Sequence, residues 1–267
     1  MPTTNELHDQ LVRHLEQLVS GDDWTAMMRA ASRFHDYSAR NVMLIQAQRP
    51  DATRVAGFST WKQLGRHVKK GAKGIAILAP CLRKHDDIEE AATARLTFRT
   101  AFVFDETDTE GDEIVEVSPT LLTGDAPGEM WQIISGLITE RGFSLDRGDC
   151  SPANGITRWL DKRVSIRPQL EPAQAVKTLV HELGHIICDH GSEPRPQRDI
   201  AEVEAESIAY IVCAATGIES DNYSFPYVAH WSNGDINLVK TTAERVVRLA
   251  HEVITQINNR QPAPALA

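Results

Sequence analysis

HELGHIICDH, residues 181–190, places two histidines four positions apart, with a glutamate directly after the first. Pro172 suits the first turn of a helix and Gly191 suits the position after its end, so we expect a helix over residues 172–190. With about 3.6 residues per turn, His181 and His185 then lie on one side of the helix, one turn apart. Two neutral imidazoles at this spacing are typical ligands of Zn²⁺. The stretch therefore predicts a zinc site on a helix.

The same helix carries a candidate for acid–base chemistry. Catalytic zinc takes three protein ligands and a water molecule, whose pKa falls towards ~7. Glu182 is offset by one residue from His181, and we expect it to take a proton from that water and pass it to the leaving group. Gly184 inside the helix costs about 1 kcal/mol relative to alanine, so we also expect another element to approach its backbone closely.

The third ligand must come from another segment, and the next predicted helix, residues 198–217, supplies three glutamates. In ideal helical geometry Glu202 and Glu206 share a face, whereas Glu204 lies about 160° away from Glu202. Acidic side chains on a buried helix need a partner, and a metal ion is such a partner. Either Glu202 or Glu206 could therefore complete the site.

Other polar residues near the motif receive weaker assignments. His190 falls outside the face of the histidine pair, and we expect it to be structural or solvated. An oxyanion could be stabilised by Tyr223, Tyr227 or His230, and the sequence does not select among them.

The charge of the chain is unevenly distributed over its 267 residues, whose net charge is −9. Between Trp24 and His85, twelve Lys or Arg face two Asp, so that segment carries +10 and the remainder −19. Such asymmetry indicates one polyanion-binding unit and one unit with a different task. A chain of this length suits two domains, and we place their boundary near residue 125.

Aromatic and basic side chains interleave in the cationic segment, as single-stranded nucleic acid requires. Phosphates bind cations, and each unstacked base gains roughly 1–3 kcal/mol on an aromatic ring. Phe58 is expected in the core, and Trp61 fits the core and base stacking about equally. The candidate DNA contacts are Arg40, Asn41, Arg54, Trp61, Lys62, Arg66, Lys69, Lys70 and Lys73.

Periodicity gives the elements of the N-terminal half. Apolar spacing predicts helices over 5–20 and 23–47, and alternation predicts strands over 75–82 and 95–104 that could pair. The four cysteines are scattered, so we expect reduced thiols in the core. Because the N-terminus is polar and no apolar run is long enough to cross a bilayer, we expect a cytoplasmic protein without membrane contact.

Residues 37–80, YSARNVMLIQAQRPDATRVAGFSTWKQLGRHVKKGAKGIAILAP, together with FVFDETDTEG at 102–111, resemble the N-terminal single-stranded-DNA-binding domain of ArdC-like antirestriction proteins. The tail SFPYVAHWSNGD, residues 224–235, also resembles that family. The resemblance implies an α+β fold. A small basic α+β DNA-binding domain would occupy 1–124, and a mainly helical, gluzincin-like zinc metallopeptidase domain would occupy 125–267.

The acidic helix is similar to that of two peptidase groups. Thermolysin-like gluzincins have a ligand glutamate followed four residues later by an acidic residue, which matches Glu202 and Glu206. ImmA/IrrE-like peptidases share a Glu-x-Glu-Ala element that again aligns Glu202 with the ligand. The resemblance therefore assigns Glu202 to the metal and gives Glu206 the task of orienting a ligand histidine.

Three functions are consistent with these features. The first is a two-domain zinc-dependent peptidase whose basic domain brings the enzyme to single-stranded DNA, which would protect incoming plasmid or phage DNA from host restriction. The second is a non-enzymatic protein that coats single-stranded DNA and has a structural or inactive zinc domain. The third is an ImmA/IrrE-type protease that cleaves a repressor, with little dependence on Arg54, Lys69 or Lys70.

Overall fold

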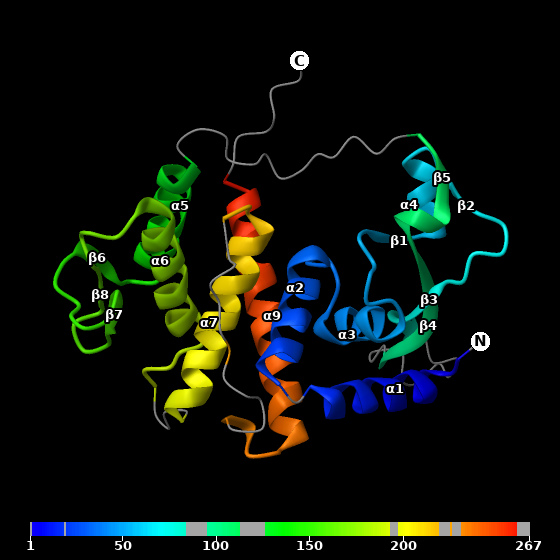
Figure 1. The fold of residues 1–267 in the computed structure, drawn as a ribbon, viewed down its shortest axis with the longest axis horizontal. Helices are drawn as coiled ribbons and strands as arrows, with labels where there is room; N and C mark the ends of the chain where they lie inside the picture. Colours follow the sequence, from blue (N-terminus) through cyan, green and yellow to red (C-terminus); the bar gives the residue numbers. More distant parts are fainter. Residues whose placement is uncertain are drawn as a thin grey trace, which may run out of the picture. The chain divides into compact units, whose positions relative to one another are not determined.

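The computed structural model of the protein describes residues 2–18, 20–83, 95–112, 126–192, 197–218, 225 and 231–260. The chain forms two compact units, and both are discontinuous in sequence (Figure 1). The first unit comprises Met1–Gln17 and Tyr37–Val115, and the second comprises Leu18–Asp36 and Glu116–Ala267. Helices and strands are mixed in both units, which confirms the α+β class. The boundary near residue 125 lies outside the described residues and stays a prediction.

The first unit is built on a three-stranded antiparallel sheet of order β1-β4-β3. Helix α3 packs on β3, and α1 packs on α3. The predicted pairing of 75–82 with 95–104 is confirmed, because Ile75 lies opposite Val103 in the register of β3 and β4. A two-stranded ladder of β2 and β5 adjoins α4. The elements are α1 (Thr4–Gln17), α3 (Ala39–Gln48), β1 (Val55–Gly57), α4 (Phe58–Gln63), β2 (Arg66–Val68), β3 (Ile75–Arg83), β4 (Arg95–Asp105), η1 (Glu106–Asp108) and β5 (Thr109–Gly111).

The single helix expected over 23–47 is wrong, because two helices, α2 (Gly21–Arg33) and α3, occupy that range. The break at 34–38 contains Asp and Ser, whose side chains compete for backbone hydrogen bonds in a helix. The Tyr37 hydroxyl also donates to the carbonyl of Val55 at 3.0 Å. Helix α2 packs against α7 of the second unit, whereas α3 packs on the sheet of the first.

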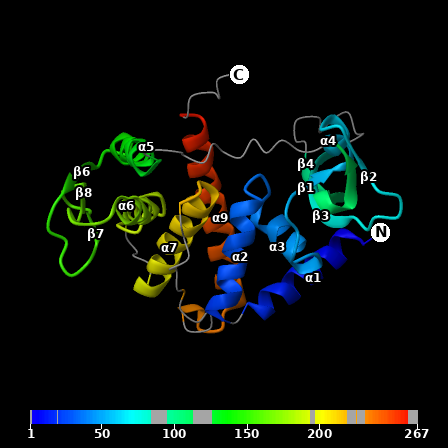
Figure 2. The same cartoon turned by 45° about the horizontal axis from the view of Figure 1, so that its top comes forward.

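The second unit is mainly helical, with a small sheet of order β6-β8-β7 at one side (Figure 2). Strand β6 runs parallel to β8, and β7 runs antiparallel to it. Helix α6 contacts α5, α7 and β7, and α7 contacts α2 and α9. The remaining elements are α5 (Ala126–Glu140), β6 (Ser144–Arg147), β7 (Gly155–Arg158), β8 (Arg163–Ile166), α6 (Pro172–Ile187), α7 (Arg198–Ala215) and α9 (Ile236–Asn258).

Close packing of α6 on α7 brings the histidine motif to the acidic helix. A Cβ atom on Gly184 would lie 3.0 Å from the Cα atom of Ala205, which explains the glycine expected to mark a close approach. On another face of α7, the buried indole of Trp24 donates to the Ser207 hydroxyl at 2.8 Å. These contacts fix α7 between α2 and α6.

Two further expectations concern the whole chain. All four cysteines are free thiols, and Cys150, Cys188 and Cys213 are buried. Among the described residues, no helix is both long and apolar enough to span a bilayer.

Candidate metal centre

Three side chains from α6 and α7 converge on one point. The Nε2 atoms of His181 and His185 lie 3.0 Å apart. Glu202 Oε2 lies 3.5 Å from the first and 3.9 Å from the second. Ligand atoms about 2.0–2.2 Å from a tetrahedral ion are about 3.3 Å from one another, so this donor set fits such an ion. These are the three residues that the sequence analysis selected, and together they form a candidate metal site.

Glu206 lies behind the ring of His181. Its Oε2 atom is 2.8 Å from His181 Nδ1, and its Oε1 atom is 3.7 Å from Lys177 Nζ. A carboxylate on Nδ1 favours a proton there and leaves the Nε2 lone pair for a metal. The two glutamates that share a helix face thus have different contacts. Glu202 lies near the Nε2 atoms of both histidines, and Glu206 contacts Nδ1 of His181.

His185 has a different partner, which sequence reasoning missed. Its Nδ1 atom lies 2.8 Å from His190 Nδ1, and His190 Nε2 lies 2.8 Å from Glu204 Oε2. Both His190 and Glu204 are buried. His190 is therefore an internal residue with two polar partners. The helical angle placed Glu204 away from Glu202, and nothing in the sequence identified His190 as its partner.

Glu182 is buried against β7 rather than exposed beside the motif. The Thr157 hydroxyl donates to Glu182 Oε2 at 2.7 Å, and a Cβ atom on Gly155 would lie 2.7 Å from Glu182 Oε1. Burial raises the pKa of Glu182 above its ordinary value, while the hydrogen bond from Thr157 acts in the opposite direction. A raised pKa suits a carboxylate that must accept and return a proton. No sequence signal pointed to Thr157.

The pKa values of the two histidines are shifted in opposite directions. Burial alone would lower the pKa of His181, but hydrogen bonds with Glu202 and Glu206 raise it to about 10. Burial lowers the pKa of His185, and the neighbouring His181 acts in the same direction. The negative charge that favours a proton on His181 would equally favour a divalent cation.

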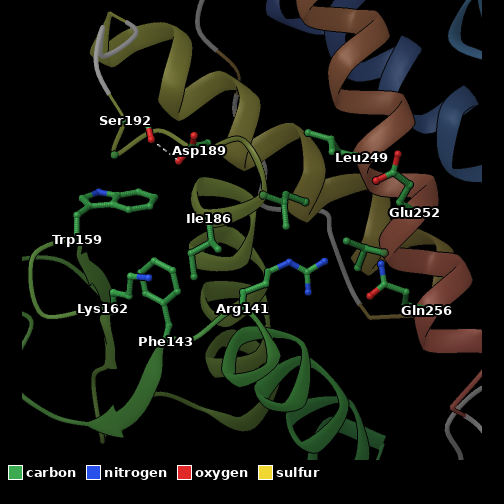
Figure 3. A pocket seen from close by; sticks show the side chains of 13 residues that line it. Arg141, Phe143, Trp159, Lys162, Ile186, Asp189, Ser192, Leu249, Glu252 and Gln256 are labelled. Atoms are coloured by element: carbon green, nitrogen blue, oxygen red, sulfur yellow. Dashed lines mark hydrogen bonds between the residues drawn. The ribbon is translucent and has the colours of Figure 1, made fainter.

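These groups line a cavity of about 620 Å³ whose wall includes the edge strand β7. A further cavity also has a volume of about 620 Å³. Arg141, Phe143 and Lys162 are among the side chains that line it (Figure 3). Trp159 lines both cavities. The three candidates for oxyanion stabilisation, Tyr223, Tyr227 and His230, lie outside the described residues.

The observed burial or exposure of three side chains in the cationic segment corrects the predictions made for them. Trp61 is fully buried and its indole donates to the carbonyl of Phe104 at 2.9 Å, so stacking on a base is the wrong role for it. The amide of Asn41 is buried and joins α3 to β3 through the backbone N–H and carbonyl of Leu78, each at 3.0 Å. Phe58, expected in the core, is 58% exposed.

The basic candidates divide into two groups. Arg66 donates to the hydroxyl of Thr109 at 2.7 Å, Lys69 donates to the carbonyl of Thr107 at 2.9 Å, and Arg54 lies 3.9 Å from Glu106. These three cations thus contact the segment 106–109 of their own unit. The second group consists of four exposed cations: Arg40, Lys62, Lys70 and Lys73.

Comparison with known proteins identifies the N-terminal part and the fold. Residues 2–121 match the family model of the N-terminal domain of anti-restriction factor ArdC. Two crystal structures of the antirestriction protein ArdC from plasmid R388, one metal-free and one Mn(II)-bound, have TM-scores of 0.54 and 0.55 at 16% and 18% identity. Each covers 85% of this chain, and the chain covers 87% and 86% of theirs. The chain thus has an ArdC N-terminal domain and an ArdC-like fold, which confirms the resemblance.

A curated relative extends the comparison. The Bacillus anthracis protein named uncharacterized protein pXO2-81 is 24% identical over 313 residues, which include 96% of this chain and 51% of the relative. The chain therefore spans about half the length of the curated relative that it matches.

Proposed function

We propose that this chain is an antirestriction protein of the ArdC type, which binds single-stranded DNA with its N-terminal unit and hydrolyses a protein substrate with its second unit. The observation that carries the proposal is the convergence of His181, His185, Glu202 and Glu182 on one cavity. The ArdC N-terminal domain and the ArdC-like fold support it. Its setting would be the cytoplasm, where incoming plasmid or phage DNA meets host restriction.

Zinc is the metal that we propose for the site. Two imidazole nitrogens and one carboxylate oxygen are the donors of many catalytic zinc sites. A bound ion would polarise a carbonyl group and lower the pKa of water towards ~7. The Mn(II)-bound structure of R388 ArdC makes manganese the competing metal for the test.

The residues of the chain have separate tasks in this mechanism. Glu182 takes the proton of the attacking water and returns it to the leaving amine, and Thr157 holds that carboxylate in place. Strand β7 pairs with β8 on one side, and it is one of the two edge strands of its described sheet. A substrate peptide would align on the other side of β7 through backbone hydrogen bonds.

For the DNA we propose a surface centred on helix α4. Phe58 and Lys62 lie four residues apart on that helix, where side chains share a face, and both are exposed. Phe58 would stack on a base, and four exposed cations of the unit would contact the phosphates. These four are Arg40, Lys62, Lys70 and Lys73.

The test combines metal analysis with digestion of casein and host proteins, with and without single-stranded DNA. We expect one zinc per chain, cleavage stimulated by DNA, and loss of cleavage without loss of zinc in Glu182→Gln. Stoichiometric zinc without cleavage would favour the alternative, a DNA-coating protein with an inactive zinc domain. Cleavage that is indifferent to DNA would favour the repressor-cleaving protease.

A further inference from the structure

We propose that His190 and Glu204 are positioning residues of the metal centre, which fix the orientation and the tautomer of His185. The inference rests on the proposed function for the presence of a metal. The observation that supports it is a row of three side chains, in which the ring of His190 lies between the ring of His185 and the carboxylate of Glu204. Neither residue of this pair belongs to the zinc-binding motif itself.

The contacts in this row are short and shielded from water. His190 Nδ1 is 2.8 Å from His185 Nδ1, and His190 Nε2 is 2.8 Å from Glu204 Oε2. The side chains of His190 and Glu204 are each 4% exposed. Hydrogen bonds in such an interior are stronger than in water, and an unpaired polar atom there is costly. The row therefore has a strong preference for an arrangement in which every contact has one donor and one acceptor.

Only one placement of the protons on the ring nitrogens of His185 and His190 meets that condition and leaves His185 able to bind a metal. A neutral imidazole has one N–H donor and one acceptor nitrogen. The carboxylate of Glu204 accepts, so His190 carries its proton on Nε2 and presents Nδ1 as an acceptor. His185 must then carry its proton on Nδ1, which leaves the lone pair of Nε2 directed towards His181 and Glu202. Glu204 thus sets the tautomer of a ring that it does not touch.

The surrounding structure holds both members of the pair. Arg245 Nη1 lies 3.3 Å from Glu204 Oε2, and the same guanidinium donates to the carbonyl of Cys188, so a cation offsets the buried carboxylate. The turn after α6 brings His190 back over the helix, with Asp189 at φ 55° and the N–H of His190 donating to the carbonyl of His185 at 3.2 Å.

The three glutamates of EVEAE, residues 202–206, then have different tasks. Glu202 faces the metal site, Glu206 contacts Nδ1 of His181 directly, and Glu204 acts on Nδ1 of His185 through His190. Both ligand histidines would therefore have a carboxylate from α7 controlling the nitrogen that is remote from the metal. Partners of this kind raise ligand basicity and hold the ring in place.

A competing role for the same residues is a second cation site. Ligand atoms of Cys188, His190 and Glu204 lie within 4.8 Å of one another. However, both nitrogens of His190 have partners, and Arg245 already contacts the Glu204 oxygen that faces His190. We therefore assign the group to orientation of His185, and the second cation becomes an outcome of the test.

The first measurement uses the full-length wild-type chain without metal. Long-range ¹H–¹⁵N correlation spectra distinguish the two neutral tautomers of histidine. We expect the proton of His185 on Nδ1 and that of His190 on Nε2. The reverse order would overturn the proposal, whatever the protein hydrolyses.

The second measurement uses Glu204→Leu, because in a glutamine variant the amide oxygen could still accept from both Arg245 and His190. Leucine removes the acceptor, and a proton on His190 Nε2 would then be buried without a partner, so we expect His190 to carry its proton on Nδ1 and to donate it to His185. We expect His185 to move its proton to Nε2 and zinc affinity, measured by competition with a chromophoric chelator, to fall about 10–100-fold. Wild-type tautomer and affinity in this variant would overturn the proposal. If the variant does not fold, the wild-type spectrum still decides.

Cys188→Ala tests the competing cation site, because the Cys188 thiol is a candidate ligand that interacts with Glu204 and is not one of the three side chains in the row. We expect wild-type tautomers, affinity and zinc content. A second equivalent of zinc in the wild type that is lost in Cys188→Ala would overturn the proposal in favour of a cation site. If the wild type has the expected tautomers but binds no zinc, the result contradicts only the proposed function.

Discussion

The hydroxyl of Thr157 donates a 2.7 Å hydrogen bond to a carboxylate oxygen of Glu182. This bond joins the edge strand β7 to the helix that carries the histidines. It places the candidate proton acceptor beside the strand on which we propose that the substrate peptide lies. The relative position of β7 and α6 therefore controls both substrate alignment and proton transfer.

Thr157→Val tests this hydrogen bond. The bond lowers the pKa of Glu182 while burial raises it, so its loss moves the pKa of Glu182 further up. The basic form needed for catalysis is then lost at a higher pH than in the wild type. We expect the acidic limb of the pH profile of kcat/KM for cleavage to move to higher pH. Thr157→Ser keeps the hydroxyl and should keep the wild-type profile, and an unchanged limb in the valine variant would contradict the assignment.

Gly155→Ala tests the close packing of β7 on α6. The added Cβ atom would lie 2.7 Å from both Glu182 Oε1 and Thr178 Cγ2, so the carboxylate must move. A displacement on the order of 1 Å can cost about 100-fold in rate, and we expect a loss of that size with zinc content unchanged. Gly148→Ala is the control, since its nearest contact, at 3.3 Å, is the side chain of Asp146. Equal activity in the two variants would show that Glu182 does not depend on this packing.

Phe58→Ala tests the proposed DNA surface. Loss of one stacked base costs roughly 1–3 kcal/mol, which is about 5- to 150-fold in affinity for single-stranded DNA. Fluorescence anisotropy with a labelled oligonucleotide measures this change. Trp61→Phe removes the indole hydrogen bond inside the core and should cost about 1 kcal/mol of stability while leaving DNA affinity unchanged. The opposite ranking of the two variants would restore Trp61 as the stacking residue.

His251 predicts a pH dependence of stability in the second unit. Burial lowers its pKa to about 4 from an ordinary 6.5, although its hydrogen bond with the carbonyl of Ala31 acts in the opposite direction. Between these values the unfolded chain binds a proton that the folded chain does not, so stability falls as pH drops through this window. The full loss attributable to His251 is about 3 kcal/mol.

His251→Gln removes that contribution. The free energy of unfolding, measured with urea at several pH values, should therefore fall less steeply with acidification in the variant than in the wild type. Parallel curves would show that His251 is not buried between α9 and α2. Because the partner of His251 is the carbonyl of Ala31, the result would also test the finding that residues 18–36 belong to the second unit.

Sequence reasoning succeeded where short-range geometry decides the outcome. The spacing of His181 and His185 on a helix, and that of Glu202 and Glu206 on the next, follow from the helical repeat alone. The two strands predicted in the first unit follow from the alternation of apolar and polar residues. The same local reasoning failed for 23–47, where each half of the expected helix packs in a different unit.

Residues defined by contacts between distant segments could not be found in this way. Thr157 lies 25 residues before Glu182, and its hydroxyl carries no signal in a short β-strand pattern. Trp61 and Phe58 occupy one short helix with similar neighbours, and only the packing of that helix determined which ring is buried. Burial of one aromatic ring and exposure of another is a property of the assembled core.

The sequence by itself determined the metal-binding motif, the acidic helix that completes it, and the resemblance to ArdC. These features are encoded within single helices and in one long stretch of sequence, where the covalent chain fixes relative positions. Only the tertiary structure decided that Glu206 serves His181, that Glu204 reaches His185 through His190, and that β7 holds Glu182. Those relationships depend on how closely α6 packs against α7 and β7, and side-chain packing between separate elements sets that distance.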